Sequence, residues 1–137
     1  MRYLVVGAHA LAANGRPRAT ADLALFIDRA AANVARLARA LAAFGFPSLA
    51  EEADRFTKPR RMASLGSPPL RIDIMNHIDG VSFARAWAGR LRATMGDHPV
   101  SFLGLRELRA NKRAAGRPKD LADVALLDEM TRVKRPR

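Results

Sequence analysis

The 137-residue chain is long enough for one domain with its own core, and its 49% of hydrophobic residues excludes an intrinsically disordered protein. The absence of cysteine excludes disulfides, thiolate metal sites and cysteine nucleophiles and favours a cytoplasmic location, while no apolar run reaches the roughly 18 residues of a membrane span. The 24 Lys and Arg against 13 Asp and Glu give a net charge of +11, which predicts attraction to RNA, DNA, nucleotides or an acidic protein. An arginine-rich genome would give the same excess without such a partner.

The chain begins with an expected strand, a short helix and a second strand. Tyr3–Val6 is β-branched and aromatic, as a buried strand requires, and Gly7 ends it. The alanine-rich residues 8–14 predict a helix that stops at the following glycine. A basic connector containing a proline then leads into a strand over residues 22–27.

Two helices are expected next, with Asp28 positioned as the N-cap of the first. The apolar face of this helix is formed by residues at three- and four-residue steps: Val34, Leu37, Leu41 and Phe44. Ser48 and Glu51 have the spacing of a capping box, which predicts a second, short helix through about Phe56.

The second half of the chain reads as strands followed by helices. Residues 62–65 and Leu70–Met75 predict two strands separated by a glycine–proline turn, with Leu70, Ile72 and Ile74 on one face of the second. A short helix over residues 81–88, a hairpin over 91–102 and two helices over 105–114 and 120–130 follow. We therefore expect one α/β (α+β) domain over residues 1–131, a short mixed sheet backed by helices on one side, and a basic tail at 132–137.

Several stretches taken together resemble the nucleotidyltransferase superfamily, in particular its minimal members. They are Val5-Val6-Gly7-Ala8-His9-Ala10, the run from Arg16 to Leu25 that contains Arg18-Ala19-Thr20-Ala21-Asp22, and Leu70-Arg71-Ile72-Asp73-Ile74. Residues 111–123 look like the end of a bacterial branch whose members resemble abortive-infection toxins and often lie near toxin–antitoxin operons. The resemblance spans nearly the whole chain and is specific in combination rather than in any one piece.

The resemblance implies metal-dependent transfer of a nucleotidyl group from an NTP to a macromolecular acceptor, namely tRNA, another RNA or a partner protein. In such a site carboxylates on neighbouring strands hold two Mg²⁺ or Mn²⁺ ions, which stabilise the charge that develops on the phosphate oxygens. The implied metal ligands and catalytic residues are Asp22 and Asp73. The implied nucleotide-binding positions are Gly7, Ala8, Arg18, Thr20, Lys112 and Arg117.

Ala24 departs from this family pattern, because the family has a second Asp two residues after the first. Alternate residues of a strand share a face, so Asp22 and an Asp at position 24 would hold the metals together. Asp28 shares that parity but lies roughly 20 Å along an extended strand, too far for two metals about 4 Å apart. We therefore expect impaired transfer; the alternative is a catalytically inactive module that binds nucleotide, nucleic acid or a partner chain in a toxin–antitoxin type system.

Two further features bear on partners and metals. Family members usually have a helix before the first strand, whereas this chain opens inside the strand region, and the apolar flank left exposed predicts a homodimer. The three histidines, His9, His77 and His98, do not have the spacing of zinc ligands.

Overall fold

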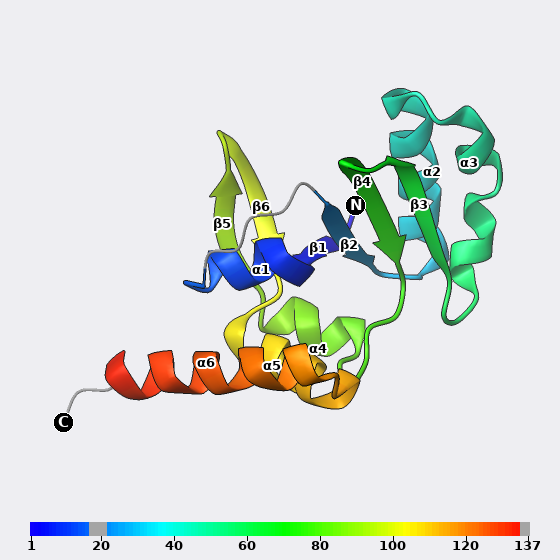
Figure 1. Cartoon of the computed structure of the whole chain (residues 1–137). Coiled ribbons are helices and arrows are strands. Elements are labelled where there is room, and N and C mark those ends of the chain that lie inside the picture. Colours follow the sequence, from blue (N-terminus) through cyan, green and yellow to red (C-terminus); the bar gives the residue numbers. More distant parts are fainter. Residues whose placement is uncertain (17–21, 135–137) are drawn as a thin grey trace.

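The computed structural model describes residues 1–16 and 22–134, with side chains through residue 132, and within them six strands form one mixed sheet (Figure 1). The strands are β1 (Tyr3–Val6), β2 (Leu23–Ile27), β3 (Met62–Ser67), β4 (Leu70–Met75), β5 (Leu91–Met95) and β6 (His98–Phe102). The helices are α1 (Gly7–Ala13), α2 (Ala31–Phe44), α3 (Pro47–Glu51), the 3-10 helix η1 (Ala53–Thr57), α4 (Phe83–Ala88), α5 (Leu105–Ala115) and α6 (Pro118–Lys134).

The sheet order is β3-β4-β2-β1-β6-β5, and the predicted α/β class is confirmed. β1 runs antiparallel to β2 and parallel to β6, while β2 runs parallel to β4. The hairpins β3–β4 and β5–β6 close the two edges of the sheet with antiparallel pairs.

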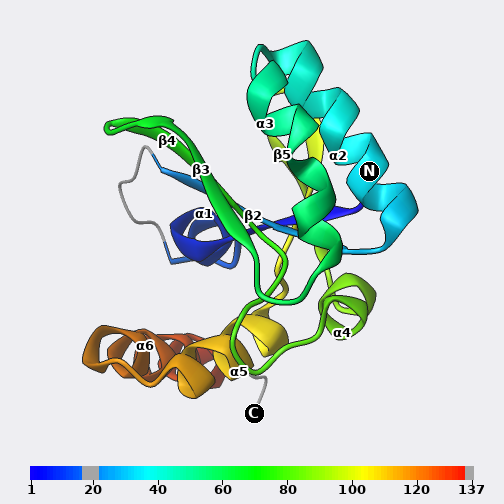
Figure 2. The same ribbon diagram turned by 90° about the vertical axis from the view of Figure 1, so that its right-hand side faces the viewer.

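Helices cover both faces of the sheet, so the expectation of helices on one side was wrong. α2 and α3 lie on the opposite side of β3 and β4 from α5 and α6 (Figure 2). Successive residues of β2 point to opposite faces, and Phe26 and Ile27, both buried, enter two different clusters. The strands are therefore apolar on both sides, a pattern that requires cover on both sides.

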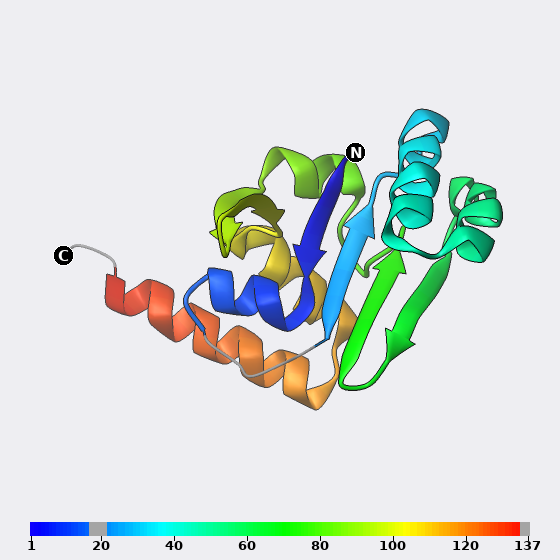
Figure 3. The same ribbon diagram turned by 90° about the horizontal axis from the view of Figure 1, so that it is seen from above.

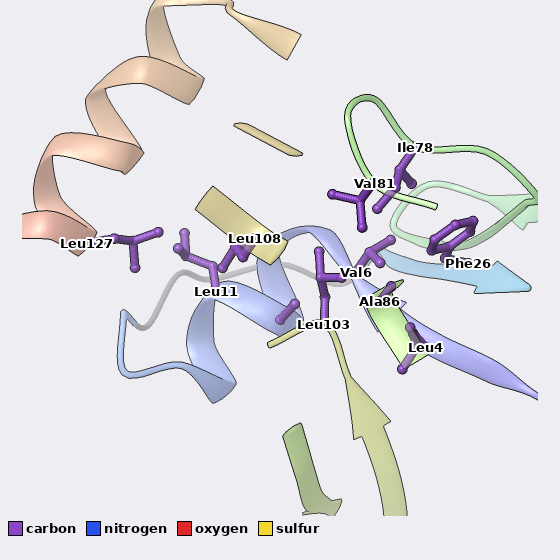
Figure 4. Packing of buried hydrophobic residues seen from close by; sticks show 11 residues of the cluster. Leu4, Val6, Leu11, Phe26, Ile78, Val81, Ala86, Leu103, Leu108 and Leu127 are labelled. Carbon is purple, nitrogen blue, oxygen red and sulfur yellow. The ribbon is translucent and has the colours of Figure 1, made fainter. Parts of the chain in front are cut away.

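One cluster packs α1, α4, α5 and α6 against the sheet, and Figure 4 shows its side chains. Its buried members are Leu4, Val6, Ala10, Leu11, Phe26, Ile78, Val81, Ala86, Leu103, Leu108 and Leu127. The other cluster lies under α2 and η1 and is formed by Ile27, Val34, Leu37, Leu41, Ala53, Phe56, Leu65 and Ile74. Both clusters draw on β2, which therefore lies in the middle of the protein.

Both predicted helix starts were placed on the wrong capping residue. α2 begins at Ala31 after Ala30, and Asp28 instead accepts a hydrogen bond from the Ala30 N–H at 3.1 Å in the turn before the helix. α3 begins at Pro47 and has no side-chain cap. The fixed φ of proline suits the first helical position, so the helix begins before Ser48 could act as its N-cap.

Two apolar residues predicted to face the core lie on the surface instead. Phe44, 66% exposed, belongs to the last turn of α2 and stacks on Phe46 with a centroid distance of 5.8 Å. Leu70, 75% exposed, is the first residue of β4, at the tip of the β3–β4 hairpin. Sequence periodicity correctly identified the buried faces of α2 and β4. It did not identify where each element leaves the core, and the side chains at those ends are exposed.

The topology brings three distant stretches of the chain to one edge of the sheet (Figure 3). Because β1 and β2 are antiparallel, the end of β1 at Val6 pairs with Ala24 near the start of β2. Because β2 and β4 are parallel, Ala24 also pairs with Asp73. The first residue of α1, Gly7, therefore lies next to the positions where the family-like carboxylates were expected.

Candidate nucleotide site

Gly7 joins β1 directly to α1 in a backbone conformation that favours glycine. Its φ is +69°, in the left-handed region, and a Cβ placed on it would lie 3.6 Å from the Cβ of Ala24. The chain therefore turns sharply into the helix while leaving open space above the start of β2. The glycine turn therefore meets the strand that carries Ala24.

Asp22 and Asp73 lie on the same face of the sheet, with the guanidinium of Arg71 between them. Arg71 Nη2 is 3.5 Å from Asp22 Oδ2, and Arg71 Nε is 3.2 Å from Asp73 Oδ1. The Ser64 hydroxyl donates to Asp73 Oδ1 at 2.6 Å from the neighbouring strand β3. The Asp73 side chain is 13% exposed and the Asp22 side chain 47%, so the Asp73 carboxylate is the more buried of the two.

This set of donors does not fit a pair of divalent cations. The Arg71 guanidinium contacts both carboxylates and occupies the space between them. Ala24 contributes no oxygen at the position between them. Within residues 1–16 and 22–134 no group of three or more His, Cys, Asp or Glu side chains is placed to hold a metal ion.

A pocket of about 300 Å³ opens beside Gly7 and Ala24, at the low end of the volumes that bind small molecules. Its floor comes from the end of β1 and the starts of α1 and β2, and its walls from the β4–α4 loop, α5 and the start of α6. The polar lining residues are His77, Asp79, Asn111, Lys112, Arg117 and Asp120. Ala24 thus belongs both to the pocket wall and to the pair with Asp73.

The β4–α4 loop is fixed against α5 at the pocket wall. Asn111 Nδ2 donates to the carbonyl of Asp79 at 3.0 Å, and His77 Nε2 lies 3.5 Å from Asp79 Oδ1. A Cβ at Gly80 would lie 2.6 Å from the Ala114 Cβ, so only glycine allows this close approach of the loop to the helix. The wall is therefore held in place by backbone packing as well as by polar contacts.

Lys112 and Arg117 contact carboxylates of α6 within the same wall. Lys112 Nζ is 2.9 Å from Asp123 Oδ2 and 3.7 Å from Asp120 Oδ1, and all three residues are buried. Arg117 Nε donates to Asp120 Oδ2 at 2.6 Å, and this hydrogen bond holds the pKa of the Asp120 carboxyl below its ordinary value. The two cationic side chains predicted to bind nucleotide, Lys112 and Arg117, are therefore paired with aspartates of α6.

The structure thus groups the predicted site residues unevenly. Gly7 lines the pocket, as do Lys112 and Arg117, whereas Ala8 follows in the first turn of α1 and is not among the lining residues. Asp22 and Asp73 lie beside the pocket, and both contact the guanidinium of Arg71. Arg18 and Thr20 lie outside the described residues.

Sequence reasoning missed Arg71 and the pair Asp120 and Asp123. Arg71 has the same strand parity as Asp73, and that alternation was a signal for a cation beside the carboxylate. The two aspartates are three residues apart on α6, a spacing that puts both on one helix face and could have indicated a shared cationic partner.

No helix in the described part of the chain combines the length and apolar composition needed to cross a membrane. Neither a model of a known protein family nor a curated protein matches this chain.

Proposed function

We propose that this protein is a nucleotidyltransferase-like module that binds a nucleotide beside Gly7 and is impaired in metal-dependent transfer. The observation that carries the proposal is the convergence of the glycine turn, Ala24 and Asp73 at one edge of the sheet, next to the pocket. These are the stretches on which the resemblance to the family rests, and they are distant in the sequence.

We expect impaired transfer because an arginine side chain occupies the position where the metal ions would bind. The Arg71 guanidinium supplies the positive charge between Asp22 and Asp73 that divalent ions would otherwise provide. Removing preorganised charge stabilisation from a transition state typically lowers a rate by about 100- to 1000-fold. Nucleotide binding depends less on these carboxylates, because neither Asp22 nor Asp73 lines the pocket.

We expect the affinity for nucleotide to be modest. The charged side chains that line the pocket, two cationic and two anionic, cancel when His77 is neutral, so attraction of phosphates comes mainly from the overall charge of +11. A dissociation constant on the order of 1 mM is the expected result. The alternative role as a partner-binding or nucleic-acid-binding module of a toxin–antitoxin type system is compatible with such a weak site.

Replacing Gly7 with Asp is expected to abolish nucleotide binding. The new carboxylate would enter the pocket next to Ala24 and repel phosphates, and Asp tolerates a positive φ better than most residues. The measurement is thermal unfolding with each of the four NTPs at about ten times the dissociation constant. At that concentration binding stabilises the folded state by about 1.4 kcal/mol, which raises Tm by a few degrees.

The matched control is Gly96→Asp. Gly96 has a φ of +61° in the β5–β6 turn, and a Cβ there would meet no atom within 4 Å. This variant carries the same added charge on a similar backbone, so it should keep the full nucleotide-dependent rise in Tm. A rise of the same size in Gly7→Asp would place the nucleotide elsewhere, and no rise in the unsubstituted protein with any NTP would refute the proposal.

A further inference from the structure

A cluster of three arginines surrounds Trp87 of α4, at the opposite end of β1 from Gly7. The Arg90 guanidinium lies 4.0 Å from the centre of the Trp87 ring and that of Arg2 lies 5.4 Å from it. Arg92 of β5 lines a pocket that also contains Trp87. Figure 3 shows the start of β1 beside α4, so residues far apart in the sequence contribute to this cluster.

The positive charge of this cluster is uncompensated. In the part of the chain that the structure describes, none of the three arginines forms an ion pair, whereas Arg71, Arg109, Arg113 and Arg117 all do. Burial lowers the pKa of Arg90, and the neighbouring charges of Arg92 and Arg2 lower it further. Three cations are therefore held together against their mutual repulsion, an arrangement that an anion would stabilise.

The arginines are positioned by the fold rather than left on loose loops. The Arg2 backbone is fixed on both sides by Asn33 of α2, whose Oδ1 accepts from the Arg2 N–H at 2.6 Å and whose Nδ2 donates to the Arg2 carbonyl at 3.0 Å. Arg90 Nη1 donates to the Trp87 carbonyl at 2.7 Å, and Arg92 is paired with Ser101 across the β5–β6 hairpin. Pre-positioned cations bind an extended anion with little loss of side-chain entropy.

A pocket of about 210 Å³ lies within the cluster. Its walls are mainly aromatic and apolar, with two hydroxyl groups: Met1, Tyr3, Trp87, Pro99, Val100 and Ser101, together with Arg92. Tyr3 and Gly7 are four strand residues apart, roughly 13 Å, which separates this pocket from the one beside Gly7.

From this geometry we infer that the cluster of Arg2, Arg90 and Arg92 around Trp87 is a binding surface for single-stranded nucleic acid, with the arginines on phosphates and one nucleoside in the pocket. Guanidinium groups match phosphate oxygens bidentately, and the aromatic and apolar walls of the pocket offer a base an apolar contact surface. An acidic polypeptide would satisfy the arginines but would leave these walls without a matching group. The net charge of +11 adds an attraction for polyanions that a single phosphate ion would use only in part. This inference does not depend on the nucleotide proposal, because the two sites share no residue.

The test compares two double variants with the same change in net charge, from +11 to +9. Arg2→Gln with Arg92→Gln removes two exposed members of the cluster. Arg36→Gln with Arg39→Gln removes two exposed arginines of α2 that form no ion pair with any other described residue. The probe is a fluorescein-labelled oligouridine of about 12 nucleotides, with the matching DNA oligonucleotide as a second arm, and the measurement is fluorescence anisotropy from about 50 to about 200 mM salt. We expect the cluster variant to bind about tenfold more weakly and to lower the salt slope by about 1.4, while the α2 variant binds within about twofold of the unsubstituted protein.

A second measurement needs no variant, because Trp87 is the only tryptophan in the chain. Saturation with unlabelled oligonucleotide is expected to change the emission of Trp87. Equal weakening of the two double variants, unchanged Trp87 emission at saturation, or equally tight binding of polyglutamate of the same charge would each overturn the inference. Preference for the RNA or the DNA arm identifies which nucleic acid supplies the phosphates.

Discussion

Ala24→Asp is expected to raise nucleotidyl transfer at least about 100-fold over the unsubstituted chain, the effect typical of one preorganised charge-stabilising group. Position 24 pairs with Asp73 in the parallel β2–β4 ladder, where adjacent strands lie about 4.8 Å apart, and it shares a face with Asp22. A third carboxylate would add one negative charge and two oxygen ligands for a cation beside Asp22 and Asp73. The measurement is the transfer of label from α-labelled NTPs to total RNA and to cell lysate, with Mg²⁺ or Mn²⁺.

The control for this experiment is Ala24→Asn, which has nearly the same shape and no charge. It should label no acceptor above the level of the unsubstituted protein. If the unsubstituted protein labels an acceptor as fast as Ala24→Asp, then Arg71 does not impair the site and the assignment of the carboxylates is wrong. If neither protein labels any acceptor, the role as a binding module without chemistry gains support.

Lys112→Met is expected to destabilise the protein by about 3–5 kcal/mol, because it leaves Asp120 and Asp123 buried without their shared cation. Methionine keeps most of the apolar length of the side chain, so the loss reports charge rather than packing volume. The measurement is urea-induced unfolding followed by circular dichroism, which gives the free energy of unfolding.

Arg113→Met is the matched control on the same helix. Arg113 pairs with Asp128 at 3.3 Å, but both side chains are about half exposed, and exposed pairs contribute about 0–1 kcal/mol. A loss in Lys112→Met no larger than in this control would mean that the α5–α6 contact does not depend on the buried pair.

The sequence predicted the order of strands and helices well, because most elements carry a strong periodic pattern. Alternation along Leu70–Met75 and the three- and four-residue steps of α2 both predicted real core faces. The errors fell on helix starts, where Pro47 overrode the capping-box spacing of Ser48 and Glu51. The sequence analysis did not predict helices on both faces of the sheet, because a short apolar strand does not show whether one or both of its faces are buried.

The candidate site was predictable only in part, and the reason is the pairing of charges. The resemblance to the family implied that Asp22 and Asp73 lie on neighbouring strands at one site, and both side chains contact Arg71 in the structure. It did not indicate that Arg71 bridges them, nor that Asp120 and Asp123 neutralise Lys112. Strand parity and helix spacing show which side chains share a face, but the partner across strands or between helices also depends on register and on the angle of approach.

The most direct test of the central claim is the binding of Mn²⁺, measured by the loss of the electron paramagnetic resonance signal of the free ion, with and without NTP. The account predicts weak binding by the unsubstituted protein, because Arg71 holds the two carboxylates, and at least about tenfold tighter binding by Ala24→Asp. Binding of two Mn²⁺ ions by the unsubstituted protein, as tightly as by Ala24→Asp, would contradict the account.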